Sequence, residues 1–463
     1  MQPVPAVGKI EKVGSVSCPT GVLLILDGGL AWMWSHTRAP LLADCPEVIG
    51  ATENDRDLII RGPDAHAAGR AFNRSNNPIY IYDQPEDRLD ALFDAFNEVT
   101  TSLKFSAALD VLPERIPHRR RVDLVLVSNG GMGAVEFHGM WAVAVSGVPH
   151  DRSLPIMGER MPAGPDDGRW RRVWIDLRDG ETASTSRVGH VLIDEARLMA
   201  VDADALGAWD DLNSRDGKAD VVFWGRDAAA VAAEVGAGPL RNDRTEGAFG
   251  WEDVPFDDAR TRAKRIQALR TGDRKLALDF RPHTHHWQVM REVRAAPTES
   301  GVLDLAGTQL CMFMSSWGDG AYPVEADLNA SGQLLRVRIE LGCDETVQRR
   351  REVEERWFGE FAKRAIVSAR VTRDGEPVRY LYRETPDHAE DSGWRVFAGD
   401  ESDEYANTAG NASVLPLRDL LARDKELEAI LRTPAPCTFE RKDAAAPFEK
   451  IEDAALPTVD WIS

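Results

Sequence analysis

Three histidines lie in one short segment, residues 281–290, which read RPHTHHWQVM. If this segment is an extended strand, His283, His285 and Trp287 point to one face, because side chains alternate along a strand. Two neutral imidazoles two residues apart can both bind one transition metal. The same pattern also suits a binding surface or a hydrogen-bonded structural segment, so all three interpretations stay open. The metal interpretation is a hydrolase with the candidate ligands His283, His285, His286 and Asp319.

A second group of candidate functional side chains lies in residues 391–405, which read DSGWRVFAGDESDEY. Its carboxylates lie close in sequence to two aromatic residues. Carboxylates form ion pairs with Arg and Lys, and aromatic faces attract the same cations. A solvated acidic loop is the alternative. As a functional site, the group is predicted to bind a basic protein partner through Trp394, Asp400, Glu401, Asp403, Glu404 and Tyr405.

Other motifs give no sign of catalysis. The sequence lacks the GxSxG pattern of a serine nucleophile. The glycine-rich residues 129–133 lack the lysine of a phosphate-binding loop. Cys311 lies in an apolar run, where we expect a buried and unreactive thiol. We therefore predict a protein that is not an enzyme and needs no cofactor.

The net charge and the cysteine content indicate which partners the protein binds and in which cell compartment it is found. The 463 residues contain 56 Lys and Arg against 76 Asp and Glu, a formal net charge of −20. Binding to nucleic acid or to an anionic membrane requires an excess of cations, so neither is predicted. The five cysteines are widely spaced, without a CxxC pair, and no signal peptide is recognisable at the N-terminus. These features predict a cytoplasmic protein.

Four sequence blocks recur in the same order in two halves of the first three-quarters of the chain. The third pair, for example, is LVSNGGMGAV at residues 126–135 and FMSSWGDGAY at residues 313–322. Such a recurrence is typical of internal duplication. We predict two tandem copies of one mixed domain, residues 10–180 and 187–343.

Hydrophobic patterning predicts α+β architecture throughout. Apolar runs predict strands at 58–60, 124–127 and 310–314, and helical spacing predicts an amphipathic helix over 89–103. Residues 344–362 are a charged helical connector. Beyond it, the Asp374-Gly375 turn predicts a β-hairpin between residues 365–371 and 378–384. Residues 417–432 predict a single amphipathic helix.

The C-terminal motifs resemble a known family. AIVS at 365–368, YLYRE at 380–384, the DSGWRVFAGDESDEY string and CTFER at 437–441 together resemble the bacterial immunity protein 33 family. The resemblance implies a small α+β domain, placed at residues 363–456, of proteins that protect bacteria from polymorphic toxins. It implies no catalysis. The string SSWGDGAYPV, residues 315–324, is similar to an uncharacterised bacterial domain family with a WGDGxYPV hairpin.

These observations together predict a bacterial binding protein, an immunity protein that neutralises a protein toxin. Because many such toxins act on nucleic acids and are basic, an acidic surface would attract them. Two other functions remain as alternatives: the metal-dependent hydrolase described above, and a scaffold or adaptor protein.

Overall fold

The computed structural model describes residues 8–35, 56–72, 79–137, 139–224, 228–237, 240–241, 250–269 and 277–451. Internal contacts divide the chain into two units, Met1–Cys343 and Asp344–Ser463. Both units combine helices with sheets, which confirms the predicted α+β class.

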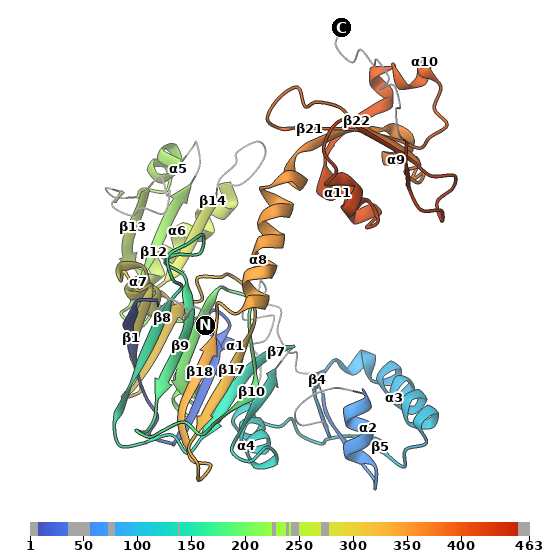
Figure 1. Cartoon of the computed structure of the whole chain (residues 1–463). Coiled ribbons are helices and arrows are strands. Elements are labelled where there is room, and N and C mark those ends of the chain that lie inside the picture. The colour runs from blue at the N-terminus through green and yellow to red at the C-terminus, as the bar shows by residue number, and fades with distance from the viewer. Residues whose placement is uncertain are drawn as a thin grey trace. The chain divides into compact units, whose positions relative to one another are not determined.

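Two six-stranded antiparallel sheets form the centre of the first unit (Figure 1). The first sheet has, in spatial order, β1 (Ile10–Ser17), β8 (Ser153–Arg160), β9 (Trp170–Asp176), β18 (Leu334–Glu340), β17 (Gly320–Leu328) and β10 (Ser184–Ile193). The second has β15 (Ser300–Leu305), β16 (Thr308–Met314), β11 (Arg197–Asp202), β2 (Val22–Asp27), β7 (Met140–Ser146) and β6 (Met132–Phe137).

The two predicted copies are interleaved in these sheets. Strand β9 of residues 10–180 pairs with β18 of residues 187–343, and β2 pairs with β11. Each sheet is symmetric in its order, with strands of the first half on one side and the corresponding strands of the second half on the other. In the first sheet, β1, β8 and β9 correspond to β10, β17 and β18. In the second sheet, β2, β7 and β6 correspond to β11, β16 and β15. Duplication therefore stays our prediction, with the difference that both halves lie in one compact unit rather than in successive domains.

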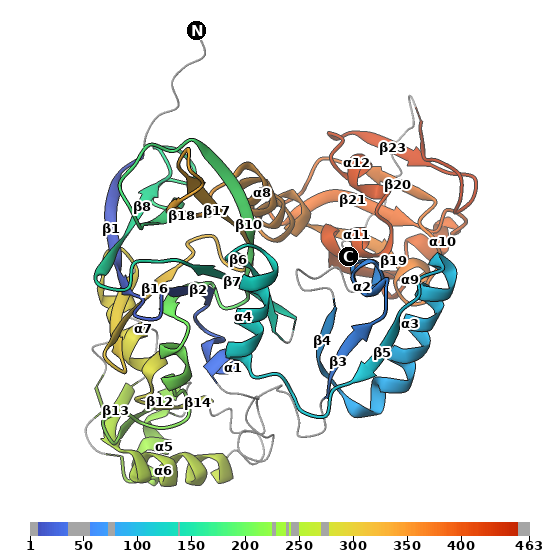
Figure 2. The ribbon, with the colours of Figure 1, turned by 90° about the horizontal axis from the view of Figure 1, so that it is seen from below.

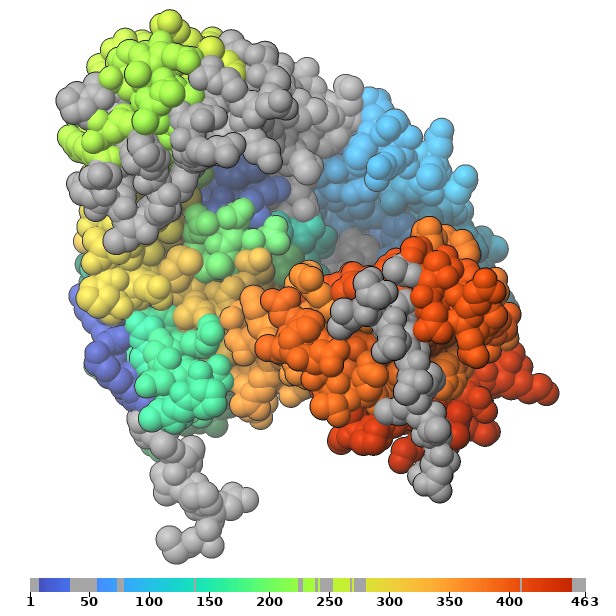
Figure 3. Space-filling model, turned by 90° about the horizontal axis from the view of Figure 1, so that it is seen from above, coloured from blue at the N-terminus to red at the C-terminus, as the bar shows by residue number. Residues whose placement is uncertain are grey.

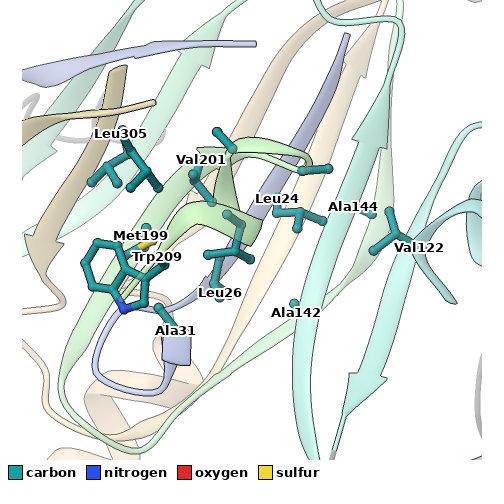
Figure 4. Close-up of a cluster of buried hydrophobic side chains, with 14 of the residues drawn as sticks. Leu24, Leu26, Ala31, Val122, Ala142, Ala144, Met199, Val201, Trp209 and Leu305 are labelled. Carbon is teal, nitrogen blue, oxygen red and sulfur yellow. The ribbon is translucent and has the colours of Figure 1, made fainter. Parts of the chain in front are cut away.

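Apolar residues on both faces explain why the second sheet is buried. In β2, VLLILD, every residue is buried, as expected of a strand covered on two sides. Leu24 and Leu26 belong to a core cluster with side chains of the neighbouring helices, such as Val122 (Figure 4). This helical layer contains α1 (Ala31–Ser35), α4 (His118–Ser128), α7 (His285–Ala295) and the 3₁₀ helix η2 (Ala205–Ala208). Figure 2 shows its helices α1, α4 and α7.

Two small lobes complete the first unit, each a three-stranded sheet with two α-helices. The first has β4 (Tyr80–Gln84), β3 (Arg56–Arg61) and β5 (Ala108–Val111), with α2 (Ala65–Phe72), η1 (Glu86–Arg88) and α3 (Leu89–Leu103). The second has β13 (Gly250–Pro255), β12 (Lys218–Trp224) and β14 (Ala277–Pro282), with α5 (Ala228–Glu234) and α6 (Phe256–Leu269). The helix predicted over 89–103 is confirmed as α3, and its Phe96 is fully buried in the lobe core.

One strand prediction in this unit is wrong. Residues 124–127 lie in α4, where Val125 and Leu126 pack into the helical layer while Val127 is 84% exposed. A short apolar run has no periodicity of its own, so burial of one helical face produced the same pattern as a strand. The strands predicted at 58–60 and 310–314 are confirmed as parts of β3 and β16.

The WGDG segment is not a hairpin turn. It joins β16 of the second sheet to β17 of the first, so the strands on its two sides are not paired. Cys311 in β16 is fully buried, and burial raises the pKa of its thiol to about 12. The expected buried thiol is therefore confirmed.

The second unit, orange to red in Figure 3, contains one mixed sheet of six strands. Their spatial order is β22 (Ala412–Pro416), β19 (Arg364–Ser368), β21 (Asp391–Phe397), β20 (Tyr380–Arg383), β23 (Cys437–Glu440) and β24 (Glu449–Lys450). The helices are α8 (Asp344–Trp357), η3 (Glu360–Ala362), α9 (Ala369–Thr372), α10 (Asp403–Ala406), η4 (Ala409–Asn411), α11 (Leu417–Arg423) and α12 (Leu427–Leu431).

Two predictions in this unit need correction. The hairpin around Asp374-Gly375 does not form, because β21 lies between β19 and β20 and runs parallel to β19. The single helix predicted over 417–432 is two helices, and Asp424, which separates them, has an extended backbone. The leucines still share one core, as the amphipathic pattern required. Every helix in the described part of the chain is too short or too polar to span a bilayer.

Candidate functional site

The DSGWR string builds the centre of the C-terminal sheet. The carboxylate of Asp391 accepts hydrogen bonds from the backbone N–H groups of Asp387 and Gly393. The hydroxyl of Ser392 donates to the carbonyl of Arg364 at 2.7 Å, which ties β21 to β19. These bonds hold the start of a strand whose seven residues are all buried. The motif is therefore a structural element of the fold.

Gly393 is required for both conformation and space. Its φ is +77°, a region that favours glycine. A Cβ atom at this position would lie 2.1 Å from the carbonyl oxygen of Glu384. No other residue fits here without moving the backbone.

Trp394 was predicted to contact the partner, and this prediction is wrong. Its side chain is fully buried among leucines of α11 and α12, and its indole N–H donates to the carbonyl of Leu431 at 3.1 Å. The guanidinium of Arg383 lies 5.7 Å from its ring. The aromatic ring of Trp394 was predicted to attract a cation of the partner, but it contacts Arg383 of its own domain.

Arg395 forms a buried ionic group with two carboxylates. It lies 3.0 Å from Asp391 and 2.6 Å from Glu384 and is 3% exposed. Burial opposes ionisation of Asp391, but the hydrogen bonds from Arg395, Gly393 and Asp387 outweigh it, so the pKa of Asp391 is lowered. A buried pair of this kind fixes the local geometry.

Asp400 is exposed, but two cations of the same domain neutralise it. Its carboxylate lies 2.6 Å from Arg370 and 3.0 Å from Arg379. Desolvation works against the ionised form, but the charges and hydrogen bonds of Arg370 and Arg379 outweigh it and lower the pKa of Asp400. Asp400 therefore offers a partner less charge than its position suggests.

Glu401 stabilises its own loop. Its two carboxylate oxygens accept hydrogen bonds from the backbone N–H groups of Ala398 and Gly399, both at 2.8 Å. Desolvation opposes ionisation of Glu401, but the hydrogen bond from Ser368 and these backbone bonds lower its pKa. A substitution here would change the loop as well as the surface charge.

Asp403 and Glu404 are the accessible acidic residues of the predicted group. Both are exposed in the first turn of α10, which Ser402 caps by accepting a hydrogen bond from the N–H of Tyr405 at 3.2 Å. Within the described residues, neither carboxylate has a cation at ion-pair distance. Tyr405, the next residue, is half-buried. Of the six predicted residues, these three remain available to a partner.

The histidine segment is not a strand beyond residue 282. Strand β14 ends at Pro282, and α7 begins at His285 after Thr284, whose hydroxyl accepts a hydrogen bond from the N–H of Trp287. The predicted alternation of His283, His285 and Trp287 is therefore wrong. A capped helix start directs the three imidazoles to different surroundings.

His283 stacks on Trp287 with ring centroids 3.6 Å apart. It lies 2.9 Å from Asp216 and 3.2 Å from Asp220. Burial lowers the pKa of His283, but hydrogen bonds to Asp220 and Asp216 outweigh it and raise the pKa overall. Because Asp220 also accepts the indole N–H of Trp287, the group joins β12 to α7.

The other candidate ligands are occupied elsewhere. Nδ1 of His285 accepts the backbone N–H of Asp210 at 2.9 Å, and Nε2 of His286 lies 2.6 Å from the guanidinium of Arg197. Asp319 accepts the backbone N–H of Ala196. In the described ranges, no three His, Cys, Asp or Glu side chains are arranged to hold a metal ion. The metal site expected from His283, His285, His286 and Asp319 is not assembled.

The outer edge of β22 is a further candidate surface, which was not predicted from the sequence. Its residues, ASVLP, include no charged side chain, and Val414 is 63% exposed. An uncharged strand that ends in proline is the signal that would have identified it, because proline within sheets is confined to edges and strand ends.

The C-terminal unit thus combines a small mixed sheet, a leucine-rich helical face, an internally paired DSGWR string and an exposed acidic turn. Residues 365–452 match the family model of the immunity protein Imm33 domain, which confirms the resemblance of the C-terminal motifs. No curated protein and no solved structure matches the chain. The similarity of residues 315–324 to a second family stays a prediction.

Proposed function

We propose that the protein binds and neutralises a basic protein toxin through its C-terminal unit. The match of residues 365–452 to the immunity domain is the observation that carries this proposal. An immunity protein acts by binding, so no catalytic group is required of the chain. The proposal includes a cytoplasmic location, where a toxin would meet its inhibitor before reaching its target.

Surface charge supports a basic partner. The chain carries a formal charge of −20, and Asp403 and Glu404 display carboxylates without cations at ion-pair distance among the described residues. Such a surface increases the rate at which a cationic protein associates, and the increase falls as salt is added. Asp400 and Glu401 support this surface indirectly, because their contacts hold the loop that leads to α10.

Co-expression tests the proposal. The full chain is expressed in a sensitive bacterium together with each protein toxin that the source genome encodes, one at a time. We expect growth to be restored against a cognate toxin and a complex to elute in gel filtration. Failure to restore growth against every one of these toxins would contradict the proposal.

A further inference from the structure

We infer that β22 is the docking edge of the immunity domain and accepts an extended strand of the toxin, next to the carboxylates of Asp403 and Glu404. This inference rests on the proposed function and adds the mode of binding. In this mode, backbone hydrogen bonds supply affinity, and side chains beside the strand supply selectivity.

Among the described residues, no strand pairs with the outer side of β22. β22 stands at the end of the sheet order, with β19 as its neighbour on the inner side. In an antiparallel pair, successive residues direct their N–H and C=O groups alternately toward the neighbour and away from it. The N–H of Leu417 donates to the carbonyl of Lys363 at 2.9 Å, so residue 417 faces β19.

Counting back from Leu417, Leu415 and Ser413 also direct their backbone groups to β19. Ala412, Val414 and Pro416 therefore direct theirs outward. The N–H of Arg364 agrees with this assignment, because it donates to Glu390 on the other side of β19. Pro416 has no N–H group, and the sheet loses no hydrogen bond by this, because residue 416 faces outward. The outward backbone groups of Val414 therefore lie on the side of β22 where no described strand pairs.

The two edges of the sheet differ in protection. At the far edge, β24 is only two residues long, and both of them, Glu449 and Lys450, are charged. Short, charged edges discourage pairing with other chains. In contrast, β22 is uncharged, pairs with β19 without a bulge and presents a largely exposed Val414. An edge of this kind is ready to pair with another strand.

Charge selects the occupant of the edge. The acidic turn of α10 precedes β22 by a few residues, with only η4 between them. A strand flanked by Arg or Lys would gain both the backbone bonds and these ion pairs. A second copy of this chain would add a like charge of −20, which opposes association. We therefore assign the edge to a strand of the basic toxin.

A matched pair of substitutions tests the assignment in the full chain, with the toxin identified by growth rescue. Val414→Pro removes the outward N–H without removing a bond to β19, whereas Val414→Thr keeps the N–H and the branched side chain. We expect Val414→Pro to weaken toxin binding by at least about tenfold and Val414→Thr by less than about threefold. Thermal melting of both variants verifies that they are folded.

Hydrogen exchange gives a second measurement that needs no substitution. The outward amide of Val414 should exchange quickly in the free chain and slowly in the complex, while the inward amides of Ser413 and Leu415 are protected in both. Equal binding by folded Val414→Pro, or unchanged exchange at Val414, would overturn the docking edge and leave the proposed function standing.

Sedimentation of the wild-type chain alone tests whether a second copy of the chain, rather than the toxin, occupies the edge of β22. A dimer that Val414→Pro converts to a monomer would place a second copy on the edge and overturn the assignment to the toxin. If the wild-type chain rescues growth against no toxin, the proposed function itself fails.

Discussion

Asp27 and Asp202 occupy the matching ends of β2 and β11, and each carboxylate binds the loop that precedes the other strand. Asp27 accepts the N–H groups of Asp194 and Glu195 at 2.6 and 3.0 Å. Asp202 accepts the N–H and hydroxyl of Thr20 at 3.0 and 2.7 Å. The two halves of the first unit are therefore joined by reciprocal hydrogen bonds to two buried carboxylates as well as by shared sheets.

Replacing one of these carboxylates should weaken the first unit. We expect Asp202→Asn to lower the free energy of unfolding by about 1–3 kcal/mol, because the amide keeps one acceptor oxygen in place of two and turns an NH₂ group toward some of the donors that Asp202 binds. Asp204→Asn is the control, since that exposed carboxylate forms a surface ion pair with Arg119. The control should cost less than about 1 kcal/mol. Urea unfolding measures both, and equal losses would contradict the reciprocal bonding.

Two glycine substitutions in the C-terminal unit distinguish the cost of a left-handed backbone from the cost of a steric collision. Gly375 and Gly393 have similar φ values, +76° and +77°, but a Cβ at Gly375 meets no atom within 4 Å. We expect Gly375→Ala to cost about 1–2 kcal/mol, from the left-handed backbone alone. Gly393→Ala should cost distinctly more, because its Cβ collides with Glu384. Similar melting temperatures for the two variants would show that the close approach is unimportant.

Acid should destabilise the first unit through His286. Burial, followed by Arg197 and Arg294, lowers the pKa of His286 to about 4, whereas the unfolded value is about 6.5. The unfolded chain therefore binds a proton that the folded chain does not, and stability falls as pH drops below 6.5.

The size of this effect can be measured with one variant. Between pH 7 and pH 5, the wild type should lose about 1–2 kcal/mol more of unfolding free energy than His286→Gln. Denaturant unfolding at both pH values gives the comparison. An identical loss in the two proteins would mean that another group is responsible.

Charge reversal tests the acidic turn. The double substitution Asp403→Lys and Glu404→Lys should slow toxin association about tenfold in low salt, and the difference should shrink as salt is added. The paired substitution Glu440→Lys and Glu449→Lys, at the opposite side of the sheet, changes the net charge by the same amount and is the control. Stopped-flow mixing with the cognate toxin measures the association rate. If the control slows association as much as the double variant, the effect is one of overall charge.

Local patterns in the sequence were enough for several elements. The apolar spacing of residues 89–103 fixes a helix, because only a helix places Leu89, Phe93 and Phe96 on one side. The C-terminal strings identified the immunity domain without any structure, since a motif in fixed order reflects a fold. The α+β class followed from the same patterns.

Tertiary structure decided what local patterns could not. Residues 124–127 and 285–287 became helical because packing against the second sheet and the cap at Thr284 outweighed their strand-like appearance. β21 entered between β19 and β20 through a parallel pairing that no turn motif announces.

The sequence by itself determined which residues are acidic, apolar or aromatic, and so the family of the C-terminal unit. Only the tertiary structure decided which of them reach the surface: it buried Trp394, paired Asp400 with two arginines and left Asp403, Glu404 and the edge of β22 accessible. The reason is physical, because accessibility depends on neighbours that come from distant parts of the chain.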